Sequence, residues 1–425
     1  MFWLFMCLRC SLNNHLQNKP FITAFYENQC SINAKFRSNP CKFVLQTGLY
    51  RLFAFSDQFF RAFLVPIRHF LLVLHLNLPI NIKNMKVPNC IITLFAMLFL
   101  LSCSRHEADV KSSLLLFQRG AYPNVIEHDG TFYYTMQAPP PNSIAIWSAS
   151  SISDINKTDS VMIWDGNANQ MSNIWAPELC YINGKWYVYF EADDGNTDNH
   201  QLYVLENSSK SPMEGSWTLH GPIITNDEWN YGIHPSSIVV GDRQYLLWSG
   251  WEHRRVETET QCIFIAEMEN PWTLKSPRFM ISKPEYEWER QWINPDGSRT
   301  AYPIFVNENP EAFLSPDKSK VIVAYSASGI WTIYNSLGVL YANASSNLLD
   351  AASWTKLPEP TFKDMSREPV LYGTSNVTVI NTATGESKII YQAKSKAKGF
   401  EESLIFVNDF EWDNTSLPVF GSPGS

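Results

Sequence analysis

Residues Ser172 to Phe190, SNIWAPELCYINGKWYVYF, contain the pattern of one complete β-hairpin. Pro177 can open a strand but cannot lie inside one, and Asn183-Gly184 is a two-residue turn that tolerates positive φ. Lys185 to Phe190 is rich in aromatic and β-branched residues at alternating positions, as expected of a strand. The stretch therefore predicts two antiparallel strands joined by a tight turn, with polar and aromatic residues at the entrance of the first strand.

The same plan recurs four more times along the chain. The other copies are Tyr122-Pro123 before NVIEHDGTFYYT, His234-Pro235 before SSIVVGDRQYLLW, Asn309-Pro310 before EAFLSPDKSKVIVAYS, and Ser375-Asn376 before VTVINTATGESKIIYQ. A third strand follows each hairpin (IAIWSAS, QLYVLEN, CIFIAEM, LGVLYAN, LIFVNDF), and four outer strands are indicated by VMIWD, SWTLHGP, PWTLKSP and SWTKLPEP. This period predicts an all-β fold, a five-bladed β-propeller with four antiparallel strands per blade. The entrances of the five inner strands then meet at one end of a central funnel, where we expect the function.

Composition and charge favour a large globular protein and make nucleic acid an unexpected partner. The 425 residues are 45% hydrophobic and 14% aromatic. Residues 1–103 hold ten Lys and Arg against two Asp and Glu, so the remainder carries 23 basic and 39 acidic residues, a net charge of about −16. This charge makes nucleic acid an unexpected partner, whereas 14 of the 15 Trp lie in the same part and suit the apolar faces of sugars.

The N-terminal region contains the features of an export signal. Residues 85–103 begin with Met85 and Lys86, continue with an apolar segment and end in Leu-Leu-Ser-Cys, which resembles a bacterial lipoprotein signal. That resemblance implies that Cys103 is lipidated and that the protein is exported and anchored to the bacterial outer membrane, periplasmic or surface-facing. Cys180 and Cys262 lie in apolar strands and are expected to be small core residues rather than a disulfide.

These features divide the chain into four parts. Residues 1–84 are either an over-extended gene start or an extension that contacts a membrane, 85–103 are the signal, 104–119 a tether, and 120–423 the propeller.

Several runs in the predicted propeller are together similar to one enzyme family. They are Ser172 to Phe190, QYLLWSGW from Gln244, VNENP from Val306 with YSASG from Tyr325, DAASWTKLPEP from Asp350, and FEWDNTSLPVFGSP from Phe410. In this order they resemble glycoside hydrolase family 43. The resemblance implies a five-bladed propeller, inverting hydrolysis of glycosidic bonds, and plant-type polysaccharides such as arabinan or arabinoxylan as substrates. We expect a monomer without a cofactor.

Inverting hydrolysis needs one carboxyl that protonates the leaving oxygen and one carboxylate that activates water. By the resemblance, Glu308 is the general acid. Where the family has the aspartate of the base this chain has Tyr122, and where it has the aspartate that modulates the acid this chain has His234. Two of the three usual catalytic carboxylates are therefore replaced. Ser375 also stands where relatives often carry an axial histidine, so we expect no bound metal.

Further residues are candidates for sugar contacts. Residues placed near the funnel by the pattern or the resemblance are Trp175, Glu178, Trp229, Trp251, Trp331 and Asn376. For Glu178 a buried acceptor that holds the axial network together is an equal alternative.

Three functional hypotheses follow. The first is a surface glycosidase whose water is activated by an unusual group, such as a substrate carboxylate, Asp193, Asp194 or His234. The second is a catalytically inactive propeller that binds carbohydrate. The third makes Tyr122 and His234 a working pair on acidic glycans, which would need arginines at the funnel mouth. Candidates for that role are Arg254, Arg255 and Arg290.

Overall fold

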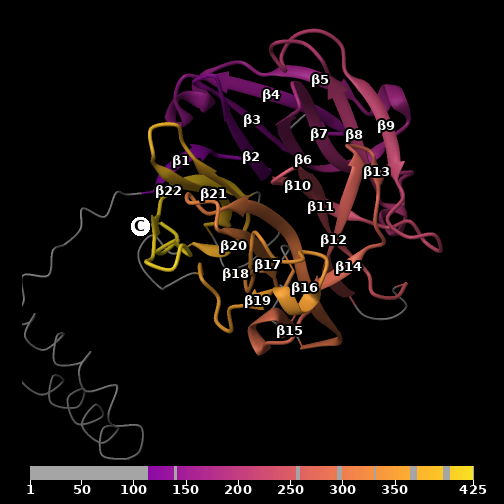
Figure 1. Ribbon diagram of the computed structural model, residues 1–425, viewed down its shortest axis with the longest axis vertical. Helices are drawn as coiled ribbons and strands as arrows, with labels where there is room; N and C mark the ends of the chain where they lie inside the picture. Colours follow the sequence, from indigo (N-terminus) through magenta and orange to yellow (C-terminus); the bar gives the residue numbers. More distant parts are fainter. Residues whose placement is uncertain are drawn as a thin grey trace, which may run out of the picture. The chain divides into compact units, whose positions relative to one another are not determined.

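Five groups of antiparallel strands follow one another around a common centre (Figure 1). Three of the groups are separate four-stranded sheets, and the other two are joined into one larger sheet by a parallel pairing of β12 (Glu259–Asn270) with β16 (Arg299–Leu314). The computed structural model describes residues 113–137, 141–254, 259–293, 299–329, 332–363, 371–395 and 403–424. Each group forms one blade, and neighbouring blades contact each other through their inner strands β2, β6, β10, β16 and β20. The predicted all-β propeller with four strands per blade is confirmed.

The blades follow the order of the sequence. Blade 1 contains β2 (Ala121–His128), β3 (Thr131–Gln137), β4 (Ser143–Ala149) and β5 (Val161–Asp165). Blade 2 contains β6 (Ser172–Ile182), β7 (Lys185–Asp193), β8 (Gln201–Asn207) and β9 (Thr218–Ile223). Blade 3 contains β10 (Ile233–Val240), β11 (Arg243–Gly250), β12 (Glu259–Asn270) and β14 (Phe279–Ser282), with β13 (Thr273–Leu274) also paired to β12.

Blade 4 contains β16 (Arg299–Leu314), β17 (Lys320–Ala327), β18 (Ser336–Asn343) and β19 (Thr355–Lys356), and β15 (Arg290–Ile293) pairs with β16. Blade 5 contains β20 (Tyr372–Asn381), β21 (Ser387–Lys394), β22 (Leu404–Asp409) and β1 (Leu114–Phe117). The remaining strands are β23 (Glu411–Trp412) and β24 (Pro418–Val419). The short 3₁₀ turns are η2 (Ile152–Lys157), η3 (Asn167–Asn169), η4 (Thr197–Asn199), η5 (Glu287–Glu289) and η6 (Ala351–Ser353).

The N-terminal strand closes the ring. β1 pairs with β22, so the last blade is completed by residues from the start of the described chain. The tether predicted over residues 104–119 therefore ends before Leu114, because the apolar run Leu114–Phe117 gains a strand partner and Leu116 becomes 2% exposed. Sequence spacing alone showed four outer strands, and this is the missing fifth.

The core is divided among the blade interfaces. Five clusters of buried apolar side chains lie between blades 1 and 2, 2 and 3, 3 and 4, 4 and 5, and 5 and 1. Burial of apolar area between neighbouring sheets contributes roughly 25 cal/mol per Å² to stability. Each blade is therefore stabilised by both neighbours. Cys262 is buried in the cluster between blades 2 and 3, whereas Cys180 is partly buried and packs against it.

Each inner strand carries a residue with left-handed backbone at a shift of its register, and β6 has a further one at Asn173 (φ 48°). The residues at the five equivalent positions are Tyr122 (φ 53°), Ala176 (41°), His234 (52°), Asn309 (52°) and Asn376 (44°). The strand register shifts at every one of these positions, as at a β-bulge, which re-aims the local side chains. Because L-residues rarely adopt positive φ, such strain persists only where the surrounding structure holds it and concentrates at functional sites. The bulges thus direct five equivalent positions toward the centre.

Hydrogen bonds between blades hold these bulges in place. A side chain on the second strand of one blade accepts a hydrogen bond from the backbone N–H of the left-handed residue in the next blade. The pairs are Glu191 with His234 (3.1 Å), Ser249 with Asn309 (2.8 Å), Ser326 with Asn376 (2.9 Å) and Gln392 with Tyr122 (3.1 Å). We call these four bonds the inner latches. The last of them joins blade 5 to blade 1.

Candidate active site

Tyr122 and His234 come from blades 1 and 3 and lie against each other at the centre. Their ring centroids are 5.1 Å apart at an interplanar angle of 32°. The His234 side chain is 2% exposed and Tyr122 is 9% exposed. The two residues predicted to stand at the positions of catalytic carboxylates therefore share one buried location, although Tyr122 and His234 are separated by a whole blade in sequence.

Glu308 lies beside the same imidazole. Its Oε2 is 3.9 Å from His234 Nδ1, and the Glu308 side chain is 2% exposed. Glu308 comes immediately before the left-handed Asn309, so the bulge in β16 fixes its direction. The distance of 3.9 Å leaves no room for a sugar ring between these two groups, whereas an acid and a base acting from opposite faces of the sugar stand roughly 6.5–9.5 Å apart. This geometry favours His234 as a neighbour that tunes Glu308 over His234 as the water-activating base.

A second buried carboxyl, Glu191, completes the group. It lies in β7 and is 0% exposed. Its Oε2 accepts the backbone N–H of His234, and its Oε1 is 3.7 Å from His234 Nε2. The imidazole therefore lies between two carboxyls, Glu191 on one nitrogen and Glu308 on the other. We call Tyr122, Glu191, His234 and Glu308 the axial group.

Burial perturbs the acid–base behaviour of the axial group. Removal from water raises the pKa of Glu191 to about 8, with the charge of Glu308 adding to this shift. Removal from water lowers the pKa of His234 to about 3, which the neighbouring His200 reinforces. Desolvation, Glu308, Glu191 and Tyr231 all raise the pKa of Tyr122 well above its usual value, so the phenol stays protonated near neutrality.

The other acids considered from the sequence are engaged elsewhere. The Asp193 carboxylate accepts hydrogen bonds from the Asn173 amide and the Gly195 backbone N–H, and lies 3.2 Å from His200 Nε2. Asp194 accepts bonds from Asn199 and from the backbone N–H of Asn196. Both carboxylates therefore stabilise the loop that follows β7.

Glu178 holds two blades together. Both of its carboxylate oxygens accept from the backbone N–H of Ser237 in blade 3, at 3.0 and 2.9 Å. The same arrangement recurs between blades 4 and 5, where Glu311 accepts from the Val379 backbone N–H and from the Thr378 hydroxyl. The contacts of Glu178 favour the buried-acceptor alternative over direct sugar contact.

The aromatic candidates occupy different depths. Trp251 is 2% exposed and its ring is stacked on Tyr231 with centroids 3.7 Å apart, which favours a packing role. Trp175 is partly exposed, lies opposite Glu191 in the β6–β7 pairing, and contacts the His200 ring at 4.5 Å. Trp229 is partly exposed and packs against the pair of Tyr231 and Trp251. Trp175 and Trp229 therefore have the exposure that a sugar-stacking residue needs.

Asn376 is fully buried in blade 5, and among the described residues its Nδ2 has no hydrogen-bond partner. Such an orphaned amide hydrogen is costly to bury, by about 1–3 kcal/mol, unless it meets water or a ligand.

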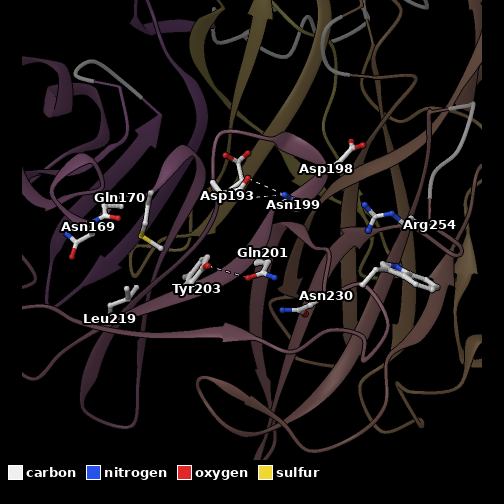
Figure 2. Close-up of a pocket in the computed structure, with 13 residues that line it drawn as sticks. Asn169, Gln170, Asp193, Asp198, Asn199, Gln201, Tyr203, Leu219, Asn230 and Arg254 are labelled. Carbon is white, nitrogen blue, oxygen red and sulfur yellow. Dashed lines mark hydrogen bonds between the residues drawn. The ribbon is translucent and has the colours of Figure 1, made fainter.

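A polar cavity of about 550 Å³ opens beside blade 2. Figure 2 shows Asn169 and Gln170 at one end, Arg254 at the other, and Tyr203 and Gln201 between them. Asp193, Asp194 and Trp229 also line the cavity, so its wall begins two residues beyond Glu191 in β7. Of the arginines expected near the mouth, Arg254 lies here, whereas Arg290 donates to the Pro284 carbonyl.

Some predicted positions lie outside the described residues, namely the leader with Cys103, Trp331 and Arg255. In the described part of the chain, no group of three or more His, Cys, Asp or Glu side chains is arranged to hold a metal ion. The described segments also contain no helix with the length and apolar character needed to span a membrane.

The family model for glycosyl hydrolases family 43 matches residues 115–416, which include every blade. The chain belongs to this family. An extracellular exo-α-(1→5)-L-arabinofuranosidase from Streptomyces avermitilis is 34% identical over 72% of this chain and 63% of its own length. A protein of the same description from Streptomyces chartreusis is 32% identical over 58% of this chain and 71% of its own length.

Solved structures of family 43 agree with the fold. An α-L-arabinofuranosidase from Lactobacillus brevis superimposes with a TM-score of 0.64 at 28% identity, covering 72% of this chain and 95% of that protein. This chain spans less than two thirds of the length of the first curated relatives, 63% for the S. avermitilis protein and 49% for an α-L-arabinofuranosidase from Humicola insolens.

Glu191 is the residue of this family 43 site that the sequence did not single out. Glu191 directly follows the aromatic run of β7, and a single polar residue there looks like an ordinary strand position. The sequence does contain a signal for Glu191, because a carboxyl directly after a run of buried strand residues needs a specific partner.

Proposed function

We propose that the protein hydrolyses α-L-arabinofuranosyl linkages of arabinan-type polysaccharides, with Glu308 as the general acid of an atypical axial site. Membership of family 43 supports a glycosidase, and the names of the Streptomyces relatives support arabinofuranosyl substrates. Trp175 and Trp229 are proposed to contact the sugar, with Asn376 donating to a substrate oxygen or water.

The observation that carries this proposal is the burial of Glu308 beside His234. A carboxyl removed from water keeps its proton to higher pH than an exposed one, and a general acid must hold a proton before it can donate it. Glu308 is attached to a strained bulge that aims it toward the centre, which a solvated loop carboxylate would not need. Since Tyr122 stands at the base position, we expect turnover on the order of 10²–10⁴ below that of the same site with an aspartate base.

The test is release of arabinose from linear and branched arabinan by the purified full chain, with arabinoxylan, galactan and host glycans in parallel. Glu308→Gln should lower kcat/KM by roughly 10²–10⁴, because it removes the donated proton. Glu311→Gln is the matched control, since it neutralises another carboxyl of β16 whose hydrogen bonds go to Thr378 and Val379 of blade 5. Absence of product from every glycan, or an unchanged rate in Glu308→Gln, contradicts the proposal.

A second candidate is an inactive propeller that binds carbohydrate. The replacement of two catalytic carboxylates by Tyr122 and His234, with retention of exposed Trp175 and Trp229, favours it. Isothermal titration with arabino-oligosaccharides separates the two candidates. Binding without turnover supports the binding module, and absence of binding contradicts both.

Export and anchoring form a separate proposal. The Streptomyces relatives are named extracellular, and residues 85–103 resemble a lipoprotein signal. We expect translation from Met85 and lipidation of Cys103, with the propeller from Leu114 onward acting as a monomer on polysaccharide. Cys103→Ser should abolish incorporation of labelled palmitate and release the protein from the membrane fraction. Palmitate incorporation that persists in this variant argues against the lipidated cysteine.

A further inference from the structure

Comparison of the four inner latches shows that Glu191 is the one acceptor among them with an ionisable side chain. At three other interfaces the acceptor is Ser249, Ser326 or Gln392, a neutral hydroxyl or amide. One acceptor atom suffices for this bond, and Glu191 makes it with Oε2 alone. A purely structural latch would therefore not require an ionisable group, whose burial is costly unless it is paired.

The second oxygen of Glu191 faces a functional group. Oε1 makes no hydrogen bond to any described residue and lies 3.7 Å from His234 Nε2. Neither ring nitrogen of His234 has a hydrogen-bond partner among the described residues, and Nδ1 lies 3.9 Å from Glu308 Oε2. Two close approaches, from Glu191 Oε1 to His234 Nε2 and from His234 Nδ1 to Glu308 Oε2, thus connect the two carboxyls through the imidazole. Catalytic hydrogen bonds are often long in the absence of substrate and shorten when it binds.

We propose that Glu191 is a positioning residue that, through His234, shares one proton with Glu308 and so keeps the general acid supplied with a proton, the task expected of an aspartate at the position of His234. This inference rests on the proposed function of Glu308 as general acid. It assigns Glu191 no contact with substrate.

The physical basis is repulsion between two carboxylates in a poorly solvated site. Glu191 and Glu308 cannot both ionise cheaply, so the pair retains one proton to higher pH than either group would alone. Burial raises the pKa of Glu191 to about 8 and the charge of Glu308 adds to this shift, so the retained proton belongs to the pair of carboxyls and not to Glu308 alone. The groups that face His234 are Glu191 from β7, Glu308 from β16, Tyr122 from β2, and His200, which follows η4. His234 itself has a lowered pKa and stays neutral, so it bridges the two carboxyls without cancelling their charge.

The decisive variant is Glu191→Gln. Glutamine retains an acceptor for the His234 backbone N–H, as Gln392 does for Tyr122, and removes only the ionisable group. With the wild-type chain active on arabinan, we expect the alkaline limb of kcat/KM to move to lower pH by about one unit or more, a tenfold loss of rate above the new limb. Glu311→Gln, which also neutralises a buried carboxyl between blades, should leave the limb in place. An unmoved limb in Glu191→Gln, or an equal shift in Glu311→Gln, overturns the proposal.

A second measurement does not depend on turnover. In the full chain labelled with ¹⁵N-histidine, the ring nitrogens of His234, assigned by loss of signal in His234→Asn, should change shift as the carboxyl pair loses its second proton. Glu191→Gln should move this inflection to lower pH. Identical titration curves, or a wild-type ring without any change between about pH 5 and pH 9, overturn the inference. A wild type without arabinan activity whose His234 still shows the inflection contradicts the proposed function alone.

Discussion

Replacement of Leu116 by alanine tests whether the ring is closed by β1. Leu116 is 2% exposed and lies in the cluster between blades 5 and 1, with Val125, Ile390 and Ile405 among its members. Truncation of a buried leucine in a packed core costs about 2–5 kcal/mol of unfolding free energy, from lost burial and from the cavity left behind. For a domain of this size such a loss lowers the melting temperature by on the order of 5 °C.

The control comes from the same strand. Leu114 is 43% exposed, so Leu114→Ala should change the free energy of unfolding by no more than about 0.5 kcal/mol. Urea unfolding of the full chain, followed by tryptophan fluorescence, measures both variants under the same conditions. If Leu116→Ala is as stable as Leu114→Ala, residues 114–117 act as a tether and the closure of the ring has been assigned wrongly.

Three further predictions concern single groups. Burial raises the folded-state pKa of Glu311 from 4.5 to about 7. Between these pH values the folded chain binds more protons than the unfolded chain, so the free energy of unfolding falls as pH rises. Glu311→Gln should remove up to about 3 kcal/mol of that fall, measured by urea unfolding at pH 4.5 and pH 7. Gly184→Ala should lower the free energy of unfolding by about 1 kcal/mol through backbone strain alone, because the φ of Gly184 is 83° and an added Cβ meets no atom within 4 Å. Calorimetry measures this loss, and an unchanged melting temperature would contradict it. Tyr122→Phe should retain kcat within about tenfold, since the buried phenol stays protonated, and a thousandfold loss would show that the hydroxyl takes part in the reaction.

Most of the blade pattern could be predicted because it is local. The Asn183-Gly184 turn, with φ values of 50° and 83°, joins β6 and β7 where the sequence indicated. Runs of aromatic and β-branched residues identified the second strand of every blade. The closing strand β1 could not be identified in this way, because its partner β22 lies at the other end of the chain and four apolar residues carry no periodic signal of their own.

The site was accessible to sequence reasoning only in part. The positions of Tyr122, His234 and Glu308 follow from their common place at the strand entrances, and the structure brings the three together. Glu191 was missed because its role depends on which blade follows β7 around the ring. Its partner His234 is 43 residues away in sequence, and no short motif contains both residues.

The pairing of β1 with β22 sets the order in which the chain can finish folding. Ser113 bonds to Asn408 across 295 residues, so the first strand of the ring remains an unpaired apolar edge until the last blade has been synthesised. Contacts of such long separation form late and slowly, because the whole intervening chain must be ordered first. Blades 1 to 4 can assemble one after another, whereas the final blade needs both ends at once. Protection of Leu114–Phe117 during biosynthesis is therefore a requirement of this architecture, and premature pairing of that segment with another molecule is its characteristic hazard.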